Sequence, residues 1–152
     1  MKFQAGIGLT ETEIVFLVKS NEVDYAGLLQ SMQDMLHYVL DELTFLLTIW
    51  INSKVAKDTG LLRSDLLKTL STSEVTDGML KVLLGTDLHY ADKVAAMTTA
   101  KVRHMIDPEA IGNFWVELQL YTKEKLMFIL QRAIDEYFKG TGKLMRMVRG
   151  RV

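Results

Sequence analysis

The sequence predicts an α+β fold in which a small antiparallel β-sheet packs against two long helices. Three observations lead to this prediction. A run rich in β-branched and aromatic residues lies near the N-terminus, two long segments carry apolar residues at steps of three and four, and a turn-rich segment, residues 58–91, separates them. The 152 residues suit a single domain, predicted as residues 1–140 and followed by a basic-apolar C-terminal tail, residues 141–152.

Residues 3–20 are predicted to form β-structure. Ile14 to Val18 is a β-branched and aromatic run of the kind that fills a buried or half-buried strand. Phe3 to Ile7 is expected to pair with it through a turn at residues 8–11.

The first long helix is predicted over Asp24–Lys57, with Asn21 or Asp24 as its cap. Such a helix would be roughly 50 Å long, whereas a compact globule of this size is roughly 40 Å across. The helix therefore either breaks or projects from the monomer, and a projecting apolar helix needs a partner. Its apolar stripe consists of Leu28, Met32, Leu36, Val39, Leu43, Leu46 and Trp50, widened by Met35, Leu40 and Leu47.

The turn-rich segment is expected to end this helix at Thr59-Gly60, with Gly60 as a left-handed C-terminal cap. Two antiparallel strands are predicted at 66–70 and 79–84, joined by a polar loop, residues 71–78, whose Asp77-Gly78 is a hairpin turn signal. A short helix is predicted over 90–99, and residues 101–106 fit no single type of element.

The second long helix is predicted to start at Asp107-Pro108-Glu109, where an acidic cap precedes a proline in the first turn. Gly112 interrupts it, Asn113 caps it again, and Gly140 ends it. Its predicted stripe is Val116, Leu120, Met127, Leu130, Ile134 and Phe138, widened by Trp115, Leu126, Ile129 and Tyr137.

Composition and motifs argue against most chemistry. The net charge of −1 does not favour coating of nucleic acid through bulk charge. With no cysteine there is no thiolate or disulfide chemistry, no secretory signal is visible, and the most apolar run, residues 45–51, is too short to span a bilayer. His37, His89 and His104 are scattered, and no serine elbow or phosphate loop is present. We therefore expect a soluble protein made in the cytoplasm, with no catalytic residues, cofactor or metal.

Two groups of residues allow a binding role. Met32, Met35 and Met127 lie on the helical stripes, where they either fill the core or offer an adaptable binding surface. The tail combines methionines with cations and no acid, so it is either a frayed terminus or a segment that docks on a partner, a nucleic acid or an anionic surface. Its candidate interface residues are Met145, Arg146, Met147, Arg149 and Arg151.

The turn-rich segment resembles the tail-component family typified by gene product ten of the HK97 bacteriophage. That family shows a long helix, Thr-Gly-x-Leu-Arg-x-Ser, two strands ending in Val-Gly-Thr, and then Tyr-Ala. This chain has Leu84 where the family has valine, and residues 93–99 and 107–110 depart from the segments that usually follow. The matching residues are Thr59, Gly60, Leu62, Arg63, Ser64, Gly85, Thr86, Tyr90 and Ala91.

The resemblance, over residues 24–138, implies a non-enzymatic head–tail joining or tail-completion subunit of a tailed double-stranded DNA virus or provirus. Such a subunit forms a homo-oligomeric ring in the virion neck or tail, contacts portal, neck or tail-tube proteins, and lets genome DNA pass without sequence-specific binding. The motif residues themselves suit a joint. Gly60 breaks a helix, the fork of Arg63 can satisfy the last carbonyls of that helix, and Tyr90 can fix the next one.

Two other functions remain open. A host helical interaction module would bind one partner through the methionine-rich stripes. A weak nucleic-acid binder would use the tail arginines, and deletion of residues 142–152 would abolish its salt-sensitive binding.

Overall fold

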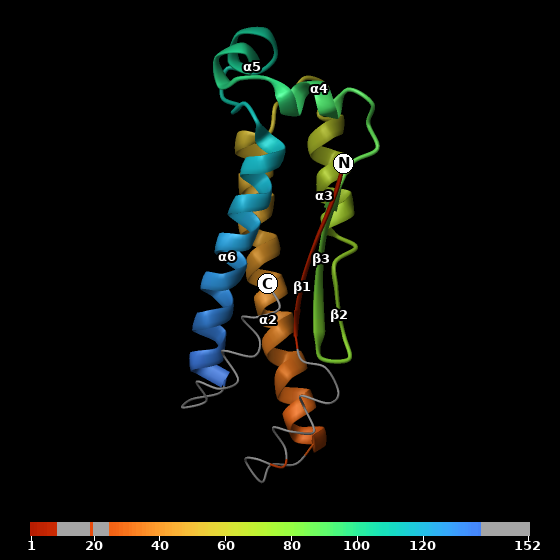
Figure 1. The fold of residues 1–152 in the computed structure, drawn as a ribbon, viewed down its shortest axis with the longest axis vertical. Coiled ribbons are helices and arrows are strands. Elements are labelled where there is room, and N and C mark those ends of the chain that lie inside the picture. The colour runs from red at the N-terminus through yellow and green to blue at the C-terminus, as the bar shows by residue number, and fades with distance from the viewer. Residues whose placement is uncertain (9–18, 20–24, 138–152) are drawn as a thin grey trace.

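A computed structural model describes residues 1–8, 19 and 25–137 and confirms the predicted α+β class. In chain order its elements are β1 (Lys2–Gly8), α2 (Tyr25–Lys54), α3 (Leu61–Leu70), β2 (Glu74–Thr76), β3 (Met79–Gly85), α4 (Ala91–Ala96), α5 (Thr99–Met105) and α6 (Phe114–Tyr137). Figure 1 shows an elongated molecule in which α2 and α6 run side by side in opposite directions. The sheet and α3 lie on the other side of α2, and α4 and α5 cover one end.

The long helix α2 is the centre of this arrangement, because α6, α3, β2 and β3 all pack against it. It is unbroken over 30 residues, a length of about 45 Å, and its N-terminal end extends past the ends of α6 and the sheet (Figure 1). Most of its predicted stripe is confirmed, since Leu28, Leu40, Leu46 and Trp50 are half-buried and the other members are buried. Its buried residues are Met32, Met35, Leu36, Val39, Leu43, Leu47 and Ile51.

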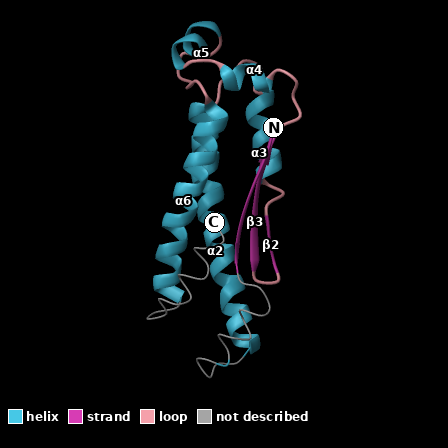
Figure 2. Cartoon of the chain, in the orientation of Figure 1, coloured by secondary structure: helices cyan, strands magenta, loops and turns pink. Residues whose placement is uncertain are grey.

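The described sheet has the strand order β1-β3-β2, with both pairs antiparallel (Figure 2). Ile7 pairs with Leu80 and Ala5 with Val82, so the buried side chains of β1 and β3 share the face that packs on the helices. Asp77 and Gly78 both have positive φ, 52° and 77°, as a tight hairpin turn requires. The second predicted strand and its turn are thus confirmed, although the strand that precedes the turn, β2, lies in the segment predicted as a loop.

The prediction of a strand at 66–70 is wrong, because these residues form the second half of helix α3. Leu62, Leu66 and Leu70 are spaced by four and are all buried, which is the stripe of a helix. Gly60 does adopt the left-handed conformation, with φ 87°, but it precedes α3 as its N-cap. The prediction that Gly60 ends the first helix is therefore wrong, since α2 ends six residues earlier at Lys54.

The predicted start of the last helix at Asp107-Pro108-Glu109 is also wrong, because α6 begins at Phe114, directly after Asn113. Residues 107–113 form a loop, and the short elements before it are α4 and α5. The predicted stripe of α6 is partly wrong, since Val116 and Leu120 are 46% and 56% exposed. Leu126, Ile129, Leu130 and Ile134 of the predicted stripe are buried as expected, and the other buried residues of α6 are Phe114, Leu118, Thr122 and Ala133.

Several predictions fall on residues outside the described ranges: the strand at 14–18 and its pairing, the caps at Asn21 and Asp24, Phe138, the stop at Gly140 and the tail. Within those ranges, no helix combines the length and apolar character needed to cross a membrane.

Candidate functional site at the joint between the helices

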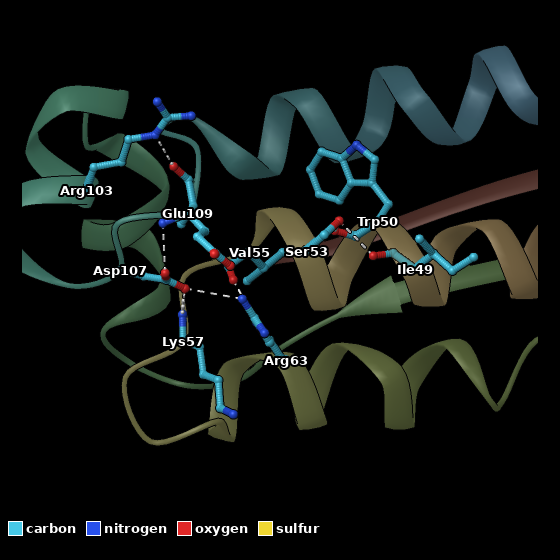
Figure 3. Close-up of polar contacts among 10 residues, drawn as sticks. Ile49, Trp50, Ser53, Val55, Lys57, Arg63, Arg103, Asp107 and Glu109 are labelled. Atoms are coloured by element: carbon cyan, nitrogen blue, oxygen red, sulfur yellow. Dashed lines mark hydrogen bonds and ion pairs between the residues drawn. The ribbon is translucent and has the colours of Figure 1, made fainter.

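A polar joint holds the end of α2, the start of α3 and the loop before α6 together (Figure 3). Arg63, in the first turn of α3, donates from Nε to the carbonyl oxygen of Val55 at 2.7 Å, directly after α2. Its Nη2 donates to Oδ2 of Asp107 at 3.2 Å, and both side chains are largely buried, at 16% and 12% exposed. The expected role of Arg63 at the end of the first helix is therefore seen in the structure, with a carboxylate added to it.

Asp107 receives two further hydrogen bonds from the backbone. Its Oδ1 accepts from the N–H of Glu109 at 3.0 Å, and its Oδ2 accepts from the N–H of Lys57 at 2.9 Å. The pKa of Asp107 is lowered, chiefly by the Glu109 hydrogen bond and then by the Lys57 hydrogen bond and the charges of Arg63 and Lys57, although burial opposes this. The carboxylate is thus kept charged and tied to three segments.

Three consecutive residues of the loop after Asp107, residues 110–112, are held by contacts with neighbouring segments. Arg103 Nε donates to the carbonyl of Ala110 at 3.0 Å, and the N–H of Ile111 donates to the carbonyl of Lys54 at 3.0 Å. At Gly112 a Cβ atom would lie 2.2 Å from the backbone of Thr98 and Thr99, so only glycine fits there without displacement of the chain. The loop therefore fixes the direction in which α6 leaves the joint.

The first group of motif residues, within residues 59–64, surrounds the start of α3. Thr59 Oγ1 accepts from the N–H of Leu61 at 3.4 Å, and the N–H of Ser64 donates to the carbonyl of Gly60 at 3.0 Å. Leu62 is buried and Ser64 is exposed. These residues shape the turn into α3, and their contacts are structural.

The second group of motif residues, within residues 85–91, includes the contacts that hold the end of β3 to the N-terminus. Thr86 donates from its N–H to the carbonyl of Met1 at 3.0 Å and accepts at its own carbonyl from the Met1 amine at 3.2 Å. Thr69 Oγ1, on α3, donates to the carbonyl of Gly85 at 2.9 Å. Tyr90 then stands at the N-cap of α4, and Ala91 is buried as the first residue of that helix.

The structure brings part of the two groups together in one pocket. Thr59, Gly60 and Leu62 line a cavity of about 260 Å³ together with Tyr90. Val94, Met97 and Ile106 make its other walls apolar, with Asp58 and Lys93 among its charged lining residues.

Other motif residues lie elsewhere. Arg63 and Ser64 border a separate recess beside Lys57. Gly85 and Thr86 line a pocket of about 400 Å³ beside Thr69 and the start of β1. The tail residues, Met145 to Arg151, are outside the described part of the chain.

Sequence reasoning missed the role of Asp107, which was predicted to cap a helix. Asp followed by Pro is also a signal for a side-chain turn, in which the carboxylate accepts from a backbone N–H two residues later, and that turn is what forms here. The partners Lys57 and Arg63 are 50 and 44 residues away in sequence, so no local pattern reveals them.

A second feature is the apolar surface on the outside of the long helices. We call the surface formed by Phe45 and Ile49 of α2 and Tyr121 and Phe128 of α6 the α2–α6 face. Phe45, Ile49 and Phe128 are 63%, 52% and 61% exposed. Trp50 connects the two helices, since its ring stacks on Tyr121 at a centroid distance of 5.7 Å.

Cations already lie over the aromatic rings of this face. Lys125 Nζ is 5.6 Å from the ring centre of Tyr121 and 6.0 Å from that of Phe128, and the Arg132 guanidinium is 5.8 Å from Phe128. Arg132 also contacts α2, with Nη2 3.7 Å from a Glu42 carboxylate oxygen and 3.3 Å from the Tyr38 hydroxyl.

The opposite flank of α6 carries a second apolar surface. Val116, Leu120 and Lys123 are spaced by four and three residues and so share a face of the helix. Lys123 Nζ lies 5.8 Å from the ring centre of Phe3 in β1, which places this face on the side of the sheet. The long helices therefore expose apolar residues on two distinct flanks.

Among the described residues, no group of three or more His, Asp or Glu side chains converges where a metal ion could bind. Comparison with protein-family models, curated proteins and solved structures finds no significant match to this chain.

Proposed function

We propose that this chain is a non-enzymatic structural subunit that joins head and tail, or completes the tail, in a tailed double-stranded DNA virus or provirus. It assembles head-to-tail into a ring through which the genome passes, and its neighbours are portal, neck or tail-tube proteins. The sequence resemblance names the class, and the geometry of the joint and of the long helices supports it.

The observation that carries this proposal is the exposure of large apolar residues on two flanks of the α2–α6 pair. Phe45, Ile49 and Phe128 lie on one flank, and Val116 and Leu120 lie on the other. A head-to-tail ring needs two different surfaces on each subunit, whereas a two-fold dimer needs one self-complementary surface. The exposed flanks meet the first requirement.

The joint supports the same proposal. Asp107 and Arg63 fix where α3 leaves α2, and the anchored loop fixes where α6 begins. A ring closes only when each subunit presents its two interfaces at one set angle. A rigid joint at one end of two long helices provides such an angle.

The alternative of a host interaction module that binds through methionine stripes loses part of its basis. Met32 and Met35 are fully buried in the core, as the core-filling interpretation of these residues predicts, and neither is available to a partner. A host interaction module would instead have to bind its one partner through the exposed flanks, and it would be a monomer or a dimer.

Mass photometry and negative-stain imaging of the full chain test the proposal. We expect rings or one defined higher oligomer, and association with portal, neck or tail-tube proteins encoded nearby. A strict monomer at high concentration that binds none of these proteins would contradict it, and a stable dimer would favour the interaction module. Terminase, portal and capsid genes beside the coding sequence would independently support the class.

A further inference from the structure

The α2–α6 face has the chemistry of a receptor for a cationic, apolar segment. The aromatic rings of Phe45 and Phe128 are exposed on it. Lys125 and Arg132 already lie over the Phe128 ring within the subunit. Aromatic faces attract guanidinium and ammonium groups, and thioethers pack favourably against aromatic edges. A partner segment that combines arginine with methionine would therefore suit this surface.

Carboxylates surround the same face. Asp41 lies one helical turn before Phe45, Glu124 lies one turn before Phe128, and both are exposed. Glu42, half-buried, contacts Arg132, and Asp135 is exposed in the last turns of α6. These carboxylates are only partly balanced by Lys125 and Arg132, so the face favours an approaching positive charge.

The chain itself contains a segment of matching composition. Residues 142–152 carry four cations, no acid and the apolar residues Leu144, Met145, Met147, Val148 and Val152. The cations are Lys143, Arg146, Arg149 and Arg151. The 15 residues that follow Tyr137 can span up to about 50 Å when extended, which is enough to reach a neighbouring subunit.

We propose that residues 142–152 of one subunit dock on the α2–α6 face of the next subunit and form the contact that closes the ring. This inference rests on the proposed ring. If the segment docked on its own subunit, the two complementary surfaces would satisfy each other and leave a monomer, whereas exchange between subunits uses both surfaces in a head-to-tail contact. Arginines meet the Phe45 and Phe128 rings and the surrounding carboxylates, and the methionines cover the apolar surface.

Photo-crosslinking between isotopically distinct chains tests the proposal. A benzophenone amino acid replaces Phe128 in the full-length chain, and equal amounts of light and ¹⁵N-labelled chains are dissociated, mixed and reassembled before irradiation. Leu120, 56% exposed on the opposite flank of the same helix, is the matched control position. We expect position 128, and not position 120, to cross-link to residues 142–152, with light–heavy pairs among the products.

The outcomes separate this inference from the proposed function. Rings whose position 128 never cross-links to the tail, or does so only within one chain, overturn the inference and leave the ring proposal standing. A monomer at all concentrations overturns the ring proposal and this inference with it. If residues 142–152 are required for DNA binding and position 128 does not cross-link to them, the inference is also overturned, because nucleic acid is then the binding partner of the segment.

A charge variant provides a second measurement. Replacing Lys143, Arg146, Arg149 and Arg151 with Gln keeps the length and the apolar residues of the segment. We expect at least a tenfold weaker assembly, measured by mass photometry across a dilution series, with an unchanged circular dichroism spectrum. Assembly equal to that of the natural chain would contradict the proposal.

Discussion

Asp107 joins three segments through three hydrogen bonds: the N–H groups of Glu109 and Lys57 and the guanidinium of Arg63 all donate to its two carboxylate oxygens. Its removal leaves these donors in a largely buried place with no acceptor, and a buried unpaired polar group costs more than a typical hydrogen bond contributes.

We therefore expect Asp107→Ala to lower the free energy of unfolding by about 2–4 kcal/mol. Asp107→Asn retains a carbonyl oxygen and should cost less. Urea denaturation followed by circular dichroism measures both variants. An alanine variant as stable as the natural chain would show that the joint does not hold the helices together.

The same residue predicts a pH dependence. Because the folded-state pKa of Asp107 is lowered, its contribution is complete above the unfolded-state pKa of about 3.9 and is lost as pH falls through the lower folded-state value. The stability difference between the natural chain and Asp107→Asn should therefore be constant near neutral pH and shrink below about pH 4. Urea titrations at neutral and acidic pH measure this difference, and a gap that widens in acid would contradict the assignment.

Gly60 tests backbone conformation alone. Its φ is 87°, and a Cβ atom there would have no neighbour within 4 Å, so Gly60→Ala introduces strain without a clash. We expect a loss of about 1–2 kcal/mol in unfolding free energy. Gly60→Asn is the control, since asparagine tolerates this conformation better; equal losses for both variants would indicate a cause other than backbone strain.

At the scale of elements, the packing of α6 on α2 depends on a different stripe from the predicted one. Leu118 is fully buried, whereas Leu120, two residues later, is 56% exposed. We expect Leu118→Ala to destabilise the fold by about 2–5 kcal/mol and Leu120→Ala to change it by no more than about 0.5 kcal/mol. Thermal and urea unfolding of the two variants, under conditions where the chain is monomeric, make the comparison.

Elements whose determining residues lie close together in the sequence were easier to predict than elements that depend on distant contacts. The stripe of α2 and the hairpin turn at Asp77-Gly78 are local patterns, and both were predicted. Leu62, Leu66 and Leu70 form an equally local four-residue pattern, but grouping 66–70 as one apolar run hid it. The start of α6 was misplaced because Asp107 is held by Lys57 and Arg63, far away in sequence, so its capping chemistry serves a loop and not a helix.

At the scale of the whole molecule, α2 sets the shape. Its 30 residues run unbroken past the elements that pack on it, and the joint gathers the chain at the opposite end (Figure 1). Most of the large exposed apolar residues lie along the sides of the long helices, where neighbouring subunits of the proposed ring would meet.

The proposed contact between tail and helix face is partly electrostatic, so assembly should respond to salt. At about 1 M salt the Debye length is about 3 Å, and attraction between exposed charges is largely screened. We expect the oligomer to dissociate at a higher protein concentration in high salt than in low salt, as measured by mass photometry. A chain lacking residues 142–152 is the control, and its residual assembly should change little with salt.

The sequence by itself determined the α+β class, the long first helix, the hairpin turn and the role of Arg63 at the end of that helix, because each is encoded by residues close together in the chain. Only the tertiary structure decided the partner of Arg63, the loop that precedes α6, and which flanks of α2 and α6 stay exposed. These features depend on contacts across many tens of residues, and a helix with apolar residues around much of its circumference does not indicate which of them a neighbouring element will cover.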